Sequence, residues 1–319
     1  MPLHPQAKAF LAGIEASGAP PLHELSPEEA RAATGMITEL MGAGPRVATV
    51  EDFTIATTAG EIGARHYEPE DAAGTILWMH GGGWVICDLD THDAVCRLLA
   101  STSGCRLIAV DYRRAPEHPF PAPLEDCWDA LVAAAVRNES EPLIIAGDSA
   151  GGNIAAACTL RARDRGGPEL ALQLLVCPVV DHDMTTTSYR ERGSGPDLFI
   201  TAKDMEWFWN LYLPDPAARS VPDASPLRAE DVSNLPPAIV ITAEYDPLRD
   251  EGIAYAQRLE AAGVSVTHRH HDDMFHDFFS FVNLIDAGNE AVERAGGEIR
   301  TLVGAPSPRR LAERQKLDG

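Results

Sequence analysis

The stretch LIIAGDSAGG, residues 143–152, decides the fold. Its first four residues form an apolar run that suits a strand buried on both faces, and the Ala-rich residues that follow favour a helix. Between them, Gly147 and Gly151 flank Ser149 in the pattern G-x-S-x-G. A sharp strand-to-helix turn needs small neighbours, because its central residue takes a strained backbone conformation. We therefore expect Ser149 to present its hydroxyl at the carboxyl end of a strand. The alternative is a glycine-rich turn with an incidental Ser, which this strand and helix context disfavours.

Similar runs recur on both sides of this stretch and alternate with helical patterns. Alternation of strands and helices predicts an α/β fold with a mostly parallel central sheet flanked by helices. We expect the apolar strands at 75–79, 107–110, 143–146, 172–177, 238–242 and 264–267. We expect the helices between them at 94–101, 124–136, 150–163 and 249–262.

The remaining segments divide the chain further. Residues 1–45 look helical, because Ser26, Pro27 and the two acids that follow are typical of a helix N-terminus. A hairpin split at Ala59-Gly60 is expected over 47–67, at the start of a main unit formed by residues 46–182 and 226–305. Residues 183–225 carry no strand pattern and predict an inserted helical piece. Residues 306–319 are expected to form a flexible tail.

Composition excludes several classes of protein. The chain has 319 residues, 45% of them hydrophobic and 23% charged, which is ordinary for a globular protein. Its net charge of −22 argues against nucleic acid and against anionic membrane surfaces as partners. The six cysteines form no C-x-x-C pair and suit buried free thiols in a reducing cytoplasm. We see no secretory signal in the first 18 residues and no apolar run long enough for a membrane span, so a cytoplasmic protein is expected.

A second glycine-rich segment, HGGGW at residues 80–84, follows another strand. Successive glycines expose backbone N–H groups, which can be preorganised to hold a developing oxyanion. We expect Gly81, Gly82 and Ala150 to supply these donors. A phosphate-binding loop is the alternative, but no Walker Lys follows and the spacing differs from a dinucleotide fingerprint.

A nucleophilic Ser needs a base, and the base needs an orienting acid. In this type of fold the chain order is Ser, then Asp or Glu, then His. Asp246 follows the strand at 238–242, and His276 lies beyond the last expected strand. The group at 268–271, with three histidines, reads as the end of that strand; a metal site there lacks an obvious partner. We therefore expect Ser149, Asp246 and His276 to act together, with no metal and no cofactor.

Together these motifs resemble the hormone-sensitive-lipase-like family of α/β-hydrolases, the bacterial family IV carboxylesterases. The resemblance runs from about residue 75 to 280, in the family's order. It rests on residues 80–84, 111–113, 115–117, 120–122, 147–152, 225–227, 246–252, His276 and Phe278.

The resemblance implies an α/β-hydrolase fold with a helical cap, built from residues 1–45 and 183–225. It assigns Ser149 as nucleophile, His276 as base and Asp246 as the acid that orients the base. It also implies cis peptide bonds before Pro116 or Pro121.

The cap of such an enzyme shapes the substrate pocket. Candidate substrate-binding residues are Trp84, Phe199 and Trp207, together with Asp148 beside the nucleophile. The alternative for Trp207 is a place in the core of the cap.

The resemblance predicts a carboxylesterase that hydrolyses short- to medium-chain acyl esters through an acyl-enzyme. Two alternatives stay open: a non-hydrolytic ligand-binding protein or lyase of the same fold, and an amidase that uses the same triad. The expected partner is a small-molecule ester, and a homodimer could form through the edge of the last strand.

One departure from the family concerns the base. Where the family usually has Gly around the His, this chain has Asp273 and Asp277. Nearby negative charges favour the imidazolium, so we expect them to raise the pKa of His276. The alternative is that both acids point away into solvent.

Overall fold

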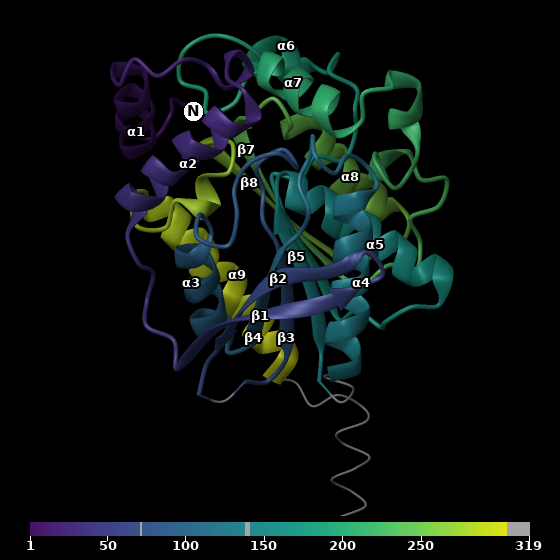
Figure 1. Cartoon of the computed structure of the whole chain (residues 1–319). Helices are drawn as coiled ribbons and strands as arrows, with labels where there is room; N and C mark the ends of the chain where they lie inside the picture. Colours follow the sequence, from purple (N-terminus) through teal and green to yellow (C-terminus); the bar gives the residue numbers. More distant parts are fainter. Residues whose placement is uncertain (71, 138–140, 305–319) are drawn as a thin grey trace, which may run out of the picture.

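The structure is a computed structural model that describes residues 1–70, 72–137 and 141–304. The expected tail at 306–319 lies outside the described residues. At the centre is one eight-stranded sheet in the order β1-β2-β4-β3-β5-β6-β7-β8 (Figure 1). The strands are β1 Thr49–Thr57, β2 Gly60–Glu68, β3 Thr75–Met79, β4 Arg106–Asp111, β5 Leu143–Asp148, β6 Leu172–Val176, β7 Ala238–Tyr245 and β8 Val266–Phe275.

The sheet is mostly parallel, as the alternating pattern predicts. β1 and β2 form the expected hairpin, and β2 also runs antiparallel to β4. From β4 through β3 and β5 to β8, every neighbouring pair is parallel. Because the carboxyl ends of parallel strands meet at one edge of the sheet, the loops after β3, β5 and β7 lie at that edge.

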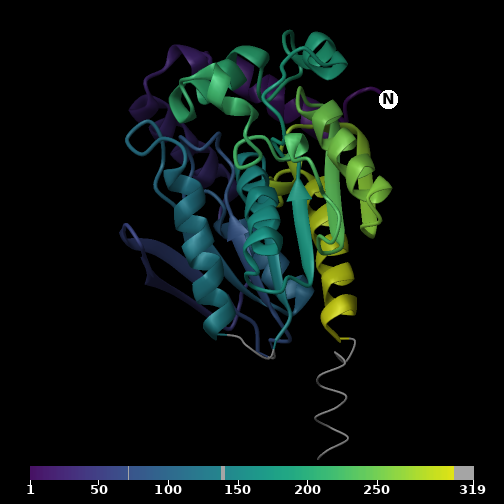
Figure 2. The ribbon, with the colours of Figure 1, turned by 90° about the vertical axis from the view of Figure 1, so that its right-hand side faces the viewer.

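Helices cover both faces of the sheet and create two cores. On one face lie α3 (Asp93–Ser103) and α9 (Asp286–Gly304), which pack against each other; on the other lie α4 (Ala122–Arg137), α5 (Ala150–Arg165) and α8 (Arg249–Ala261) (Figures 1 and 2). Side chains of a strand alternate between the faces. In β3, Ile76 and Trp78 accordingly join the α3/α9 core, while Leu77 and Met79 join the other.

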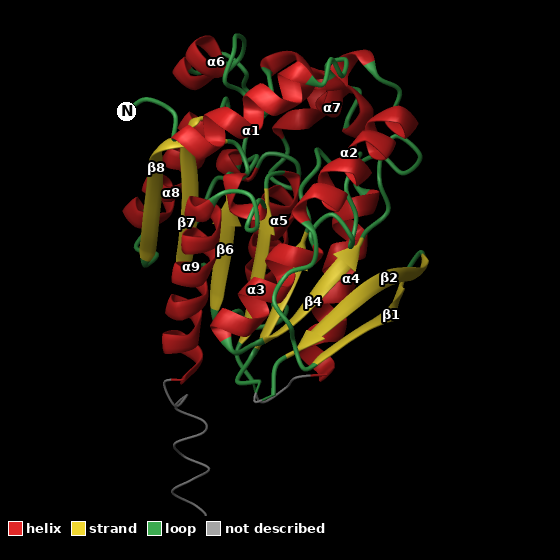
Figure 3. Ribbon diagram, turned by 90° about the vertical axis from the view of Figure 1, so that its left-hand side faces the viewer, coloured by secondary structure: helices red, strands yellow, loops and turns green. Residues whose placement is uncertain are grey.

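Four further helices gather over the carboxyl end of the parallel strands, whose arrowheads point toward them (Figure 3). They are α1 (Pro5–Ala16), α2 (Pro27–Met41), α6 (Thr187–Arg192) and α7 (Ala202–Tyr212). We call this group the cap region. It comes from the two segments, 1–45 and 183–225, that the resemblance assigns to a cap.

Local signals explain where two of these helices begin. Ser26 accepts a hydrogen bond from the amide of Glu29, whose side chain bonds back to the Ser26 amide, so the expected N-terminus of α2 is a complete capping box. Thr201 and Asp204 form the same arrangement at the start of α7.

The structure agrees with one further expectation and differs from another. The Ala115–Pro116 and Phe120–Pro121 peptide bonds are both cis, in line with the resemblance. The last strand does not end at residue 267, because β8 continues its pairing with β7 and runs to Phe275. An edge strand keeps one side open to solvent, so its polar residues do not interrupt it. None of the described helices has the length and apolar content to cross a membrane.

Candidate active site

Ser149 occupies the turn between β5 and α5, in a backbone conformation with φ 52° and ψ −117°. Only a few per cent of non-glycine residues have a positive φ, and such strain concentrates at functional sites. The turn leaves no room beside it, since a Cβ on Gly151 would lie 1.9 Å from the carbonyl oxygen of Met79. The Ser149 amide also donates to the carbonyl of Val176 at 2.8 Å. The backbone therefore fixes the direction of the Ser149 side chain.

The structure brings Ser149, His276 and Asp246 together from three loops at the carboxyl edge of the sheet. Ser149 Oγ lies 3.0 Å from His276 Nε2, and His276 Nδ1 lies 2.9 Å from Asp246 Oδ2. All three side chains are buried, with relative exposures of 6%, 3% and 0% respectively. This line of contacts can carry a proton from the Ser hydroxyl to the imidazole.

The carboxylate of Asp246 sets the tautomer of the ring. Its Oδ1 accepts the amide of Leu248 at 2.8 Å, which leaves Oδ2 for the Nδ1–H of His276. Nε2 then faces Ser149 as a hydrogen-bond acceptor. The thiol of Cys177 adjoins this pair, because its Sγ, an Asp246 oxygen and a His276 nitrogen all lie within 4.8 Å of one another. Burial and the charge of Asp246 raise the pKa of Cys177, so the thiol stays neutral.

The charge around His276 raises its pKa. Burial alone would lower the pKa of the imidazole, but the charge and hydrogen bond of Asp246 outweigh burial. Asp277 and Asp148 add to the rise. Asp273 instead raises the pKa of His271, against the lowering effect of burial. Of the two acids expected to act on the base, Asp277 therefore contributes more to the raised pKa of His276.

Asp277 belongs to a second group, with the buried residues His92 and Asp148. Ligand atoms of these three residues lie within 4.8 Å of one another, and His92 Nε2 is 3.2 Å from Asp148 Oδ2. Burial and the charge of Asp148 raise the pKa of Asp277 well above its usual range. Burial would lower the pKa of His92, but Asp148 outweighs it and raises the pKa. Sequence reasoning missed His92, which no motif marked.

Asp148, which we expected to contact substrate, lies in this second group. Asp148 is fully buried behind the glycine loop, and a Cβ on Gly81 would lie 2.1 Å from its Oδ2. Its Oδ1 is also buried and finds no hydrogen-bond partner among the described residues. Asp148 therefore supports the glycine loop and His92 rather than an open pocket.

Both three-residue groups contain ligand types that metals accept. In each group, however, the ring nitrogen is already hydrogen-bonded to a carboxylate of the same group. We therefore assign no metal to either one.

His80 supports the glycine loop that follows β3. The His80 Nδ1 donates to the carbonyl of Gly81 at 2.8 Å, and the ring stacks on Tyr112 at 4.3 Å. Burial and the charge of His92 lower the pKa of His80 to about 3, so the ring stays neutral. The loop is thereby ordered without placing another cation near Ser149.

The backbone of this loop carries the expected hydrogen-bond donors. The amides of Gly81 and Gly82, and that of Ala150 at the start of α5, donate no hydrogen bond to any residue that the structure describes. The same holds for Gly83, which sequence reasoning left out although it belongs to the same motif. These amides are available to a negatively charged oxygen next to Ser149.

The aromatic residues proposed as pocket walls take different places. Trp84 is fully buried and stacks on Tyr212 of α7 at 4.0 Å, a contact that joins the glycine loop to the cap region. Phe199 is partly buried and lies 5.7 Å from Phe275, the residue before His276. Trp207 is partly buried and packs edge-on against Phe208, also of α7. Phe199 and Trp207 remain candidates for substrate contact.

The other histidines lie apart from this site. His268 and His270 are on β8, and both contact the hydroxyl of Thr242, at 2.9 and 3.0 Å. They are strand residues with protein partners, in line with the simpler interpretation of the sequence.

The comparison with protein families matches this arrangement. A family described by the α/β-hydrolase fold matches residues 76–280, a range that holds the glycine loop and all three residues of the candidate triad. The chain belongs to this hormone-sensitive-lipase-like family of α/β-hydrolases.

Similar proteins include ones named as ester hydrolases and solved structures of esterases. Carboxylic ester hydrolase LipN of Mycobacterium tuberculosis is 41% identical over 76% of this chain and 67% of its own length. Ethyl acetate hydrolase of Pseudomonas putida is 36% identical over 92% of this chain and 96% of its own. The crystal structure of a hyperthermophilic esterase from Pyrobaculum calidifontis superposes with a TM-score of 0.89 at 39% identity, over 96% of this chain and all of that one.

Proposed function

We propose that this protein is a serine carboxylesterase that hydrolyses short- to medium-chain acyl esters through an acyl-enzyme. The observation that carries the proposal is the continuous contact from Ser149 Oγ through His276 to Asp246, at 3.0 and 2.9 Å. A buried hydroxyl, an imidazole of defined tautomer and a buried carboxylate are the parts that nucleophilic acyl transfer needs.

In the first half-reaction, Ser149 Oγ attacks the ester carbonyl and its proton passes to Nε2 of His276. Asp246 stabilises the imidazolium that forms. The carbonyl oxygen becomes an oxyanion, and the amides of the glycine loop and of Ala150 hold it. The carbon–alkoxy bond then breaks, and Nε2–H gives its proton to the leaving alcohol.

In the second half-reaction, water attacks the acyl-enzyme and His276 takes its proton. A second oxyanion forms in the same place and collapses. The Ser149 oxygen leaves with the proton from His276, and the carboxylic acid is released. The proposed reaction uses no cofactor, because the imidazole of His276 carries out the proton transfers in both half-reactions.

The substrate class rests on the relatives and on the cap region. The related ethyl acetate hydrolase carries a short-chain ester in its name. Helices α1, α2, α6 and α7 cover the carboxyl end of the sheet, which favours a small soluble ester over an emulsified fat (Figure 3).

Hydrolysis of p-nitrophenyl esters from acetate to palmitate tests the proposal. We expect wild-type turnover to be highest on the short and medium chains. Ser149→Ala should lower kcat by about 10³-fold or more, because the nucleophile is lost while oxyanion donors and binding remain.

Ser103→Ala is the matched control, since Ser103 is buried like Ser149 but lies at the end of α3. It should keep wild-type activity. Folded wild-type protein without turnover on any ester would contradict the proposal, as would Ser149→Ala with undiminished turnover.

A further inference from the structure

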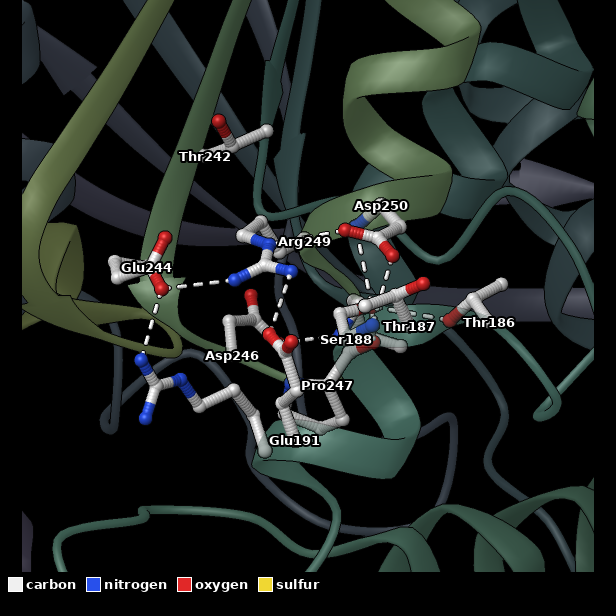
Figure 4. A network of polar contacts seen from close by, with 12 residues as sticks. Thr186, Thr187, Ser188, Glu191, Thr242, Glu244, Asp246, Pro247, Arg249 and Asp250 are labelled. Atoms are coloured by element: carbon white, nitrogen blue, oxygen red, sulfur yellow. Dashed lines mark hydrogen bonds and ion pairs between the residues drawn. The ribbon is translucent and has the colours of Figure 1, made fainter.

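Helix α6 of the cap region lies against the turn that carries Asp246. This turn, residues 246–248, joins β7 to α8, and α6 begins with Thr187. Figure 4 shows Ser188 of α6 among Thr186, Pro247 and Asp250. Ser188 has no exposed surface, so its polar atoms must be satisfied by protein.

The contacts of the Ser188 hydroxyl use its full hydrogen-bonding capacity. A hydroxyl has one hydrogen to donate and two lone pairs that accept. Ser188 Oγ donates to the carbonyl of Pro247 at 2.7 Å and accepts the amide of Asp250 at 3.2 Å. Thr186 Oγ1 lies 3.0 Å away and must act as donor, since the only hydrogen of Ser188 is already used. One buried hydroxyl therefore ties α6 to the residue that follows the catalytic acid.

Ser188 and Asp250 also cap each other's helices. The N-cap residue of α8, Leu248, has no side chain that can accept an amide hydrogen. Ser188 supplies that acceptor to Asp250 N from another helix. In return, Asp250 Oδ2 accepts the amide of Ser188, in the first turn of α6, at 2.7 Å. Free N–H groups at helix starts need such partners, and here the two helices satisfy one another.

Charged side chains brace the same junction. Arg249 at the start of α8 donates to Glu244 Oε1 at 2.8 Å and to Asp250 Oδ1 at 2.9 Å (Figure 4). Arg192 at the end of α6 donates to the same Glu244 oxygen at 2.8 Å. Burial would raise the pKa of Glu244, but the two arginines outweigh it and lower the pKa. Helix α6 of the cap region therefore contacts residues before and after Asp246 in the chain.

We propose that Ser188 and Asp250 are positioning residues for Asp246, which couple the cap region to the catalytic acid; this inference rests on the proposed esterase function. Neither side chain touches Ser149 or His276 in the contacts of the structure. They act through the backbone of residues 246–250, which sets the direction of the Asp246 carboxylate. The carboxylate in turn orients His276, and a displacement of a catalytic group by about 1 Å can cost roughly 100-fold in rate.

Ser188→Ala tests the proposal. It removes the donor to Pro247 and the acceptor for Asp250 without adding volume. We expect kcat on a short-chain p-nitrophenyl ester to fall roughly 10-fold with KM nearly unchanged, because the change affects orientation and not substrate contact. The acidic limb of kcat/KM, which reports the base, should also move. Ser188→Thr keeps the hydroxyl, so its kcat and its acidic limb should both match the wild type.

Ser225→Ala is a matched control. Ser225 lies in the same inserted segment, is also fully buried and donates to the carbonyl of Arg219 at 2.7 Å. It should lose stability to a similar degree while its kcat and pH profile stay at wild-type values. If Ser188→Ala does not fold, Ser188→Cys fills the space with a weaker donor and carries the same test.

A double-mutant cycle tests whether Ser188 and Asp250 act together on the position of Asp246. If Ser188 and Asp250 act as one unit, Asp250→Ala added to Ser188→Ala should lower kcat little further. If the losses in kcat were additive, Ser188 and Asp250 would act independently, which would contradict the proposal.

The Nδ1–H proton resonance of His276 gives a readout that needs no turnover. It should shift or broaden in Ser188→Ala and stay unchanged in Ser225→Ala, even if the wild type hydrolyses no ester. Folded Ser188→Ala with wild-type kcat, acidic limb and Nδ1–H resonance would overturn the proposal. A wild type without turnover would instead count against the esterase function alone.

Discussion

At the scale of single residues, Asp277 is the acid that, after Asp246, most raises the pKa of the proposed base. It follows His276 with φ 62°, in the left-handed region that Asp and Asn tolerate better than most residues. Its carboxyl group lies close to that of Asp148, and any negative charge that it carries raises the pKa of His276. Asn suits the same backbone and cannot be ionised, so Asp277→Asn isolates the charge.

We expect Asp277→Asn to move the acidic limb of kcat/KM to lower pH. The base must be neutral to accept a proton, so the limb follows the pKa of His276, and loss of a negative neighbour lowers that pKa. A pH-rate profile on one short-chain ester measures the shift. Asp273→Asn should leave the limb in place, because Asp273 acts on His271 instead. An unmoved limb in Asp277→Asn would mean that Asp277 stays protonated while His276 titrates.

At the scale of elements, the start of α7 joins the two segments of the cap region. Asp204 completes the capping box with Thr201 and also accepts the amide of His23 at 3.1 Å and its ring nitrogen at 2.7 Å. We expect Asp204→Ala to lower the free energy of unfolding by about 1–2 kcal/mol, because helix and N-terminal segment lose their shared acceptor. Urea unfolding measures this.

The comparison for Asp204→Ala is Ser26→Ala, which removes the box of α2 alone. It should cost about 1 kcal/mol. Equal losses for both variants would show that the His23 contacts add no stability.

These elements also show what sequence can and cannot reveal. Ser26, Pro27 and Glu29 are adjacent in the chain, so their capping box was predictable, as was Ser149 between its two glycines. The polar residues 268–273 hid the extent of β8, because backbone pairing with β7 and not side-chain hydrophobicity holds that edge strand. The contact of Ser188 with Asp250 spans 62 positions and follows no local pattern, so only the folded chain reveals it.

At the scale of the whole molecule, the excess of acidic residues affects the stability of the fold. Acids outnumber Lys and Arg by 48 to 26, and the sequence pI is about 4.8. At neutral pH the excess acids repel one another in the folded state, which destabilises it. Arg-centred ion pairs oppose this repulsion, for example Arg65 with Asp52 and Arg31 with Glu117, in which the carboxylates are exposed. Exposed pairs contribute only about 0–1 kcal/mol each, so the repulsion should win.

Salt should therefore stabilise this protein at neutral pH. Raising sodium chloride from about 0.01 M to about 0.15 M shortens the Debye length from about 30 Å to about 8 Å, and this screens distant acids from one another more than it weakens close pairs. We expect Tm, followed by circular dichroism, to rise by a few degrees. The same titration near pH 5, close to the pI, should leave Tm almost unchanged, because the net charge that salt screens is then small. A Tm that falls with salt at neutral pH would mean that the Arg-centred pairs, and not the excess of acids, set the electrostatic balance of the fold.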